Sequence, residues 1–155
     1  MAQPNFSLQA VLDMRHSHVE ALEISLGKLL AEERFGHARQ DQLRAQHGEL
    51  LMQLQKAMQD EMDMFLMDFL RRSLNSSEAE IARVQAILNE IARQVTAKRT
   101  ELINAHQAEE VLVTLKRKQD ELYLNEQKVK EANQQDDVYI AQSFRQRRQA
   151  GVMGN

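Results

Sequence analysis

Two long stretches of this chain, residues 6–72 and 78–149, repeat apolar residues every three to four positions and contain no proline. Proline interrupts helices because it lacks a backbone donor, so each stretch is free to form one continuous helix. The short polar segment 73–77 between them predicts a turn. We therefore expect an all-α fold, a long two-helix antiparallel coiled-coil hairpin, with residues 1–155 forming one domain.

The composition favours a thin helical structure over a thick globular core. Apolar residues make up 43% of the chain, but aromatic residues make up 5% and tryptophan is absent, so large core-filling side chains are scarce. Strong helix formers such as Ala, Leu, Glu, Gln, Lys and Arg are abundant.

The first stretch opens with a narrow apolar seam, a single line of residues spaced alternately four and three apart, as in coiled coils. Its members are Leu8, Leu12, Arg15, Val19, Leu22, Leu26 and Leu29. The pattern weakens through residues 34–48, where Gly36 and Gly48 each cost about 1 kcal/mol relative to alanine in a helix. A break there would give a three- or four-helix bundle instead.

The second stretch repeats the seam more strictly, and its expected start is marked by a capping box, Ser77 followed by Glu80. The seam residues are Ile81, Val84, Leu88, Ile91, Val95, Lys98, Leu102 and Ala105. The phase then slips by three residues, which overwinds a supercoil locally. It resumes at Leu112, Leu115, Gln119, Leu122, Glu126 and Val129.

Helices of near-equal length, at about 6–72 and 78–149, would bring the two ends of the hairpin together. We therefore expect Phe6 and Leu8 to pack near Ile140 and Phe144.

Several function classes find no support in the residues. Without cysteine there is no disulfide framework or thiolate chemistry, and a net charge of −3 does not favour nucleic acid. Phosphate-binding glycine motifs are absent, and no two histidines show the spacing of a zinc hydrolase. We expect solvated positions for His16, His18, His37, His47 and His106. The sequence predicts a non-enzyme without cofactor or metal, and a cytoplasmic chain with neither signal peptide nor membrane span.

The most unusual local feature is the segment MDMFLMDFL, residues 62–70, whose apolar residues cover every side of a helix. One interpretation is a thick cluster buried at the tip of the hairpin. The other is an exposed patch for a partner, since methionine adapts to irregular surfaces. Its anchors would be Phe65, Met67 and Phe69.

Near the other end, FRQRR at residues 144–148 forms a small basic cluster. Cations near a helix C-terminus are favoured by the helix dipole, so capping explains them. Docking of Arg145, Arg147 and Arg148 on an acidic protein surface is the alternative.

Both ends of the chain carry short motifs in a definite order. The opening FSLQAVLDMRHSHVEALEISLGKLLAEE has a Phe-x-Leu-x-x-Val-Leu start and an Arg- and Glu-rich continuation. The closing EEVLVTLKRKQDELYLNEQKVKEANQQDDVYIAQSFRQR has a Leu-Lys-x-Lys run, an acidic pair (Asp136, Asp137) and a final Phe144–Arg145. In these motifs the chain resembles the FliJ family of flagellar export proteins.

The resemblance implies a coiled-coil component of the type III export apparatus, similar to the γ stalk of rotary ATP synthases. Its implied partners are the hexameric export ATPase, the cytoplasmic domain of the membrane export gate, and export chaperones. Its implied location is the cytoplasmic face of the inner membrane. Candidate contacts with the ATPase ring are Phe6, Leu8, Phe144, Arg145, Arg147 and Arg148.

One feature departs from the family pattern, which places an aromatic residue and a leucine after the hairpin tip as a gate contact. With a turn at 73–77, serines and acids predominate after the tip, and Phe65 and Phe69 precede it. Two further functions fit the same periodicity: the stalk of a virulence-type secretion system, and a generic coiled-coil scaffold.

Overall fold

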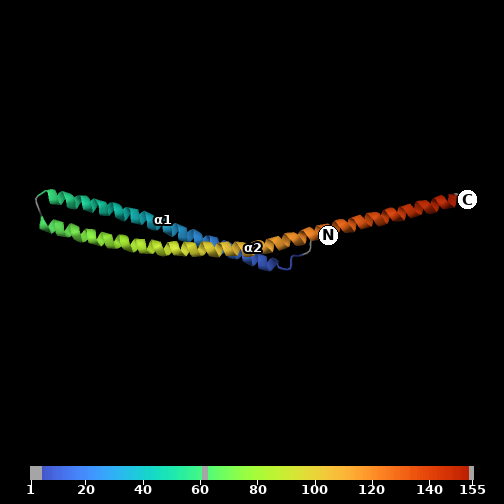
Figure 1. Cartoon of the computed structure of the whole chain (residues 1–155), viewed down its shortest axis with the longest axis horizontal. Helices are drawn as coiled ribbons and strands as arrows, with labels where there is room; N and C mark the ends of the chain where they lie inside the picture. The colour runs from blue at the N-terminus through green and yellow to red at the C-terminus, as the bar shows by residue number, and fades with distance from the viewer. Residues whose placement is uncertain (1–4, 61–62, 154–155) are drawn as a thin grey trace. The chain divides into compact units, whose positions relative to one another are not determined.

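The computed structural model describes residues 5–60 and 63–153, with side chains through Gly151, and these residues form two helices (Figure 1). Helix α1 runs over Gln9–Gln59 and helix α2 over Met64–Met153. No strand occurs in the described ranges. The expected all-α, two-helix hairpin is confirmed.

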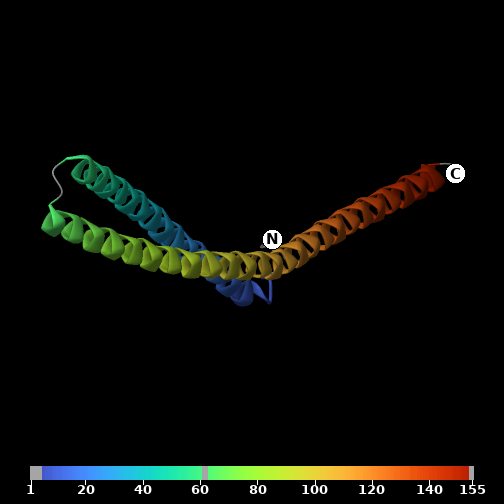
Figure 2. The same cartoon turned by 60° about the vertical axis from the view of Figure 1, so that its left-hand side comes forward.

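The chain divides into two units, which are described separately. The first, here called the paired unit, is Ser17–His106. The second, here called the terminal unit, combines Met1–His16 with Gln107–Asn155. Helix α2 contributes to both. In the paired unit, α1 and α2 lie side by side in both views (Figures 1 and 2).

The turn lies between Gln59 and Met64, so its expected position at 73–77 was wrong. The helices consequently have 51 and 90 residues rather than near-equal lengths. Residues 73–77 instead belong to α2, where Leu74 is buried, and Ser73 and Ser77 are half-buried.

Asp63 explains why α2 begins where it does. Its Oδ1 accepts hydrogen bonds from the backbone N–H groups of Phe65 (3.0 Å) and Leu66 (3.2 Å), two of the unpaired donors of the first turn. This is the geometry of an N-cap, which stabilises a helix start by about 1 kcal/mol. The Ser77–Glu80 pattern therefore starts no helix, because the backbone donors around it are already paired inside α2.

The core of the paired unit is the seam between the helices. Leu22 and Leu102 pack in one cluster with Val19 and Ala105. The residue numbers of Leu22 and Leu102, and of Val19 and Ala105, add up to 124, and this sum describes the register of the two helices. On α2 the buried positions extend the predicted seam toward the turn through Leu74, Leu70 and Met67. Burial of each such side chain contributes about 1.5–3 kcal/mol.

Helix α1 continues without a break through residues 34–48, so the alternative bundle is not adopted. Gly36 sits on the seam, where a Cβ atom would lie 2.6 Å from Leu88 Cδ2. Gln40 is 4% exposed, and its Nε2 donates to Gln85 Oε1 at 2.6 Å. Residues 34–48 can therefore pair with α2 although their apolar pattern is weak. Gly36 leaves room for Leu88, and the buried amide of Gln40 has a hydrogen-bond partner.

Candidate interaction surfaces

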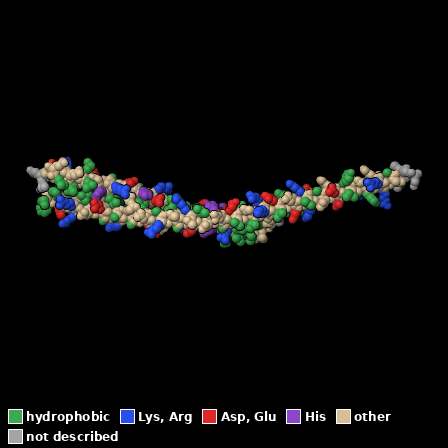
Figure 3. Space-filling view, viewed as in Figure 1, with side chains coloured by type: hydrophobic (Ala, Val, Ile, Leu, Met, Phe, Trp, Pro, Cys, Tyr) green, Lys and Arg blue, Asp and Glu red, His purple; other side chains and the backbone are tan. Residues whose placement is uncertain are grey.

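The tip of the hairpin carries an exposed apolar patch on the first turns of α2. This tip patch consists of Met64, Phe65, Leu66 and Phe69. Phe65 is 90% exposed and Phe69 is 64% exposed, and their spacing of four residues puts them on one face of α2. Hydrophobic side chains gather at this end of the molecule (Figure 3).

The segment 62–70 combines the two interpretations of the sequence. Met67 and Leu70 are 5% and 2% exposed, so they belong to the seam, and the expectation of Met67 as an accessible anchor is corrected. Met62 lies outside the described residues. With the turn at its observed place, Phe65 and Phe69 follow the tip.

The residues expected to meet at the ends of the chain are not brought together. In the terminal unit, His16 on α1 faces Glu109 on α2, and their numbers add up to 125. In the same register, Gln9, the first residue of α1, falls opposite Lys116, and Phe6 precedes Gln9 outside the helix. Phe144 lies 28 residues beyond Lys116, roughly 42 Å along a helix at about 1.5 Å per residue. The off-centre turn is the reason for this difference.

The six residues predicted to contact the ATPase ring differ in their exposure to solvent. Phe6 is half-buried, and Leu8 is 39% exposed. Phe144 is 67% exposed, and Arg145, Arg147 and Arg148 are also exposed. Between Leu124 and Gly151 all side chains are exposed except Gln127 and Ser143, which are half-buried. This part of α2 is therefore exposed to solvent on nearly all of its sides.

A stripe of apolar residues on α2 in the terminal unit was missed by the sequence analysis. Leu115, Leu122 and Val129 were expected in the seam, but they are 44%, 62% and 59% exposed. With Val111 they are spaced four and seven residues apart, so they share one face of the helix. We call these four residues the α2 stripe. Shallow hollows lie along it, one lined by Val111 and Leu115, another by Leu122 and Val129.

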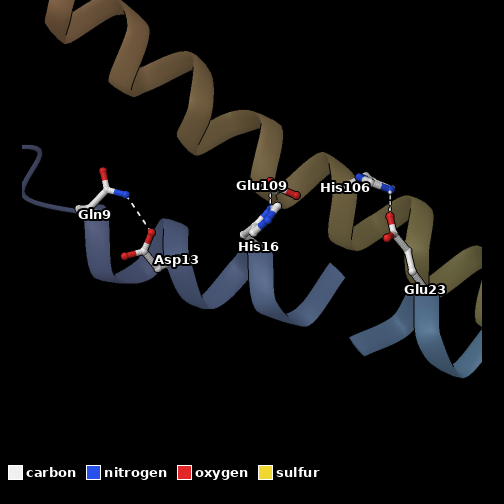
Figure 4. A network of polar contacts seen from close by, with 6 residues as sticks. All are labelled: Gln9, Asp13, His16, Glu23, His106 and Glu109. Atoms are coloured by element: carbon white, nitrogen blue, oxygen red, sulfur yellow. Dashed lines mark hydrogen bonds and ion pairs between the residues drawn. The ribbon is translucent and has the colours of Figure 1, made fainter. Parts of the chain in front are cut away.

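Three histidines contact glutamates across the hairpin. The expected solvated positions are confirmed for His16 and His106, whose side chains are 58% and 54% exposed, but the side chain of His47 is only 21% exposed. His16 Nδ1 lies 2.9 Å from Glu109 Oε1 in the terminal unit. His106 Nε2 lies 3.6 Å from Glu23 Oε1 in the paired unit, and Figure 4 shows both contacts. His47 Nε2 lies 3.9 Å from Glu78 Oε1. These contacts link the two helices by polar groups along the edge of the seam.

Neither a metal centre nor a membrane span emerges from the part of the chain that the structure describes. Within residues 5–60 and 63–153, no three metal-ligating side chains converge, and no helix is long and apolar enough to cross a bilayer.

Comparison with protein families places the chain beside known proteins. The family model described as "Flagellar FliJ protein" matches residues 4–149, nearly the whole chain. No curated protein and no solved structure matches the chain.

Proposed function

Because the chain belongs to the flagellar FliJ protein family, which implies a non-catalytic component of flagellar protein export, we propose that it binds the export ATPase ring and couples it to the export gate. It acts by binding one state of the ring more tightly than another, since a ligand shifts an equilibrium only through differential affinity. Its place is the cytoplasmic face of the inner membrane, where it also meets export chaperones.

The observation that carries this proposal is the exposed part of α2 in the terminal unit. Phe144 is 67% exposed and stands beside three exposed arginines within five residues. An aromatic residue next to arginines is the kind of anchor that dominates protein interfaces. The α2 stripe adds apolar area on the same helix, and the arginines suit an acidic surface inside the ring.

The proposal is tested by the ATP hydrolysis rate of the export ATPase titrated with the purified chain. We expect a saturable rise near one copy per six ATPase subunits. Deleting the side chains of Phe144, Arg145, Arg147 and Arg148 by alanine substitution should lower the stimulation. Tyr139→Ala serves as the matched control, because Tyr139 is 71% exposed on a different face of the same helix. No stimulation by the unchanged chain, with an ATPase that forms hexamers, favours a scaffold instead.

For the gate contact, the candidate is the tip patch. Phe65→Glu and Phe69→Glu should abolish binding to the cytoplasmic domain of the gate, measured by calorimetry, while far-UV circular dichroism stays unchanged. Phe35→Glu is the control, since Phe35 is 77% exposed elsewhere on the paired unit. Equal loss with Phe35→Glu would mean that added charge, and not the tip, disturbs binding.

A further inference from the structure

The seam of the paired unit has the same seven-residue repeat on both helices, and the repeat alone does not fix their register. Sliding α1 by one heptad against α2 again places seam positions opposite seam positions. Leu50, which now falls opposite Leu74, would fall opposite Met67 or Ile81. All three of these α2 residues are apolar. The layers near the tip therefore discriminate poorly between registers.

Gly36 and Leu88 distinguish the observed register of the two helices from the slid registers. Leu88 is 4% exposed and occupies the space that a side chain at position 36 would fill. After a slide of one heptad, Leu88 would instead fall opposite Leu29 or Leu43. At the helix separation observed around Leu88, a second side chain does not fit, so the helices would have to move apart locally. Such overpacking costs about 1–3 kcal/mol.

Gln40 adds a polar condition. Its Nε2 donates to Gln85 Oε1, and Gln85 Nε2 donates in turn to Asn89 Oδ1 at 2.9 Å. In one slid register Ala92 takes the place of Gln85, and the buried amide of Gln40 loses its acceptor. An unsatisfied buried polar group costs about 1–3 kcal/mol. In the other register Glu78 takes that place, so Gly36 and Leu88 alone oppose the slide.

We propose that Gly36–Leu88 and Gln40–Gln85–Asn89 form a register lock that selects one pairing of the two helices. A single buried polar residue in a coiled coil is known to specify register while lowering stability. The lock fixes the turn between Gln59 and Met64, and so it decides that the tip patch stands at the tip. A slide that places Leu50 opposite Met67 would move the turn away from the tip patch, and a slide that places Leu50 opposite Ile81 would move the turn into the patch.

Disulfide trapping reads the register directly, because the chain has no cysteine of its own. Leu50→Cys is combined with Leu74→Cys for the observed register, and with Met67→Cys or Ile81→Cys for the two slid registers. In a glutathione buffer we expect the 50–74 disulfide to form at least about tenfold in excess of the other two, since disulfides require close Cβ atoms. Equal formation of all three would overturn the proposal.

Gly36→Leu should then admit the 50–67 or 50–81 disulfide at the expense of 50–74. Adding Leu88→Ala should restore 50–74, because the large and small residues have exchanged places. Gly27→Leu is the control, since nothing lies within 4 Å of a Cβ at Gly27. A loss of 50–74 that Leu88→Ala does not reverse would count against the lock.

Gln40→Leu gives an independent reading, and it decides the matter if Gly36→Leu loses helicity. It should raise the melting temperature and at the same time admit a second disulfide, whereas the exposed Gln46→Leu should do neither. A variant that retains 50–74 alone would remove Gln40 from the lock. A lower melting temperature with unchanged disulfides would make Gln40 a merely structural residue.

Discussion

The two parts of α2 carry similar apolar repeats and differ in burial. In the paired unit, Leu88, Ile91 and Val95 are all at most 9% exposed. In the terminal unit, Leu122 and Val129 continue a seven-residue spacing but are 62% and 59% exposed. The difference arises because α1 begins at Gln9, so among the residues that the structure describes α2 has no partner helix beyond the region opposite Gln9. A heptad repeat thus indicates a face that suits a partner, without saying whether the partner belongs to the same chain.

The strongest way to sharpen this comparison is to truncate one leucine in each part. Leu70→Ala, at a residue 2% exposed, should lower the free energy of unfolding by about 2–5 kcal/mol through lost burial and a residual cavity. Leu122→Ala, at a residue 62% exposed, should change it by less than about 0.5 kcal/mol. Urea unfolding followed by circular dichroism measures both. Comparable losses would show that Leu122 is also covered in solution.

Hydrogen exchange compares the backbones of the same two parts. Amides of residues 124–151 should exchange about 100-fold faster than those of residues 84–105, because helices without tertiary packing open readily in water. Mass spectrometry of the unmodified chain gives both rates in one experiment. Similar protection would mean that the end of α2 is packed against something, a second copy being the simplest case.

Asp63 caps α2 at the observed turn, and Ser77 was the expected cap, so substituting each residue distinguishes the two positions of the turn. Asp63→Ala should cost about 1 kcal/mol, because two backbone donors of α2 lose their acceptor. Ser77→Ala should cost less than about 0.5 kcal/mol, since alanine is the better helix former inside α2. Thermal unfolding of both variants is sufficient, and the reverse order would return the turn to residues 73–77.

The smallest effect is expected at the edge of the seam. Arg39 Nη2 and Glu80 Oε1 lie 3.1 Å apart, with side chains 42% and 43% exposed, so water screens the pair. Arg39→Gln should cost at most about 0.5 kcal/mol, and the loss should shrink in high salt. Unfolding at two ionic strengths measures this, and a larger, salt-independent loss would indicate packing by the arginine stem.

The fold class could be predicted from the sequence because heptad repeats without proline leave few alternatives. The position of the turn could not, since Ser77 and Glu80 form a strong local signal, whereas Asp63 is one of several carboxylates, with Asp60 and Glu61, and nothing in the sequence marks it as the cap. The spacing of the apolar residues was a better guide to the position of the turn. Met67, Leu70, Leu74 and Ile81 follow one another at intervals of three, four and seven residues, as seam residues do. A seam that runs through a proposed turn argues against that turn.

For the surfaces, the sequence identified Phe65 and Phe69 because their segment has more apolar faces than one partner helix can cover. It missed the α2 stripe because exposed and paired heptads have the same spacing. It also missed the histidine–glutamate contacts, since His16 and Glu109 are 93 residues apart and their meeting depends on the register. Local patterns thus predicted local features, and the features that depend on register followed only from the position of the turn.

The short turn also has a consequence for how the chain folds. Closing a loop costs entropy that grows with its length, so the first contacts should form next to the turn. Pairing can then proceed layer by layer, past Arg39–Glu80 and Gln40–Gln85, which are 41 and 45 residues apart, to His16–Glu109 at 93. Each step extends existing structure, so contacts between distant residues form without a long-range search. We therefore expect the helices to pair first at the tip and last at His16–Glu109, and unfolding to begin at the His16–Glu109 end.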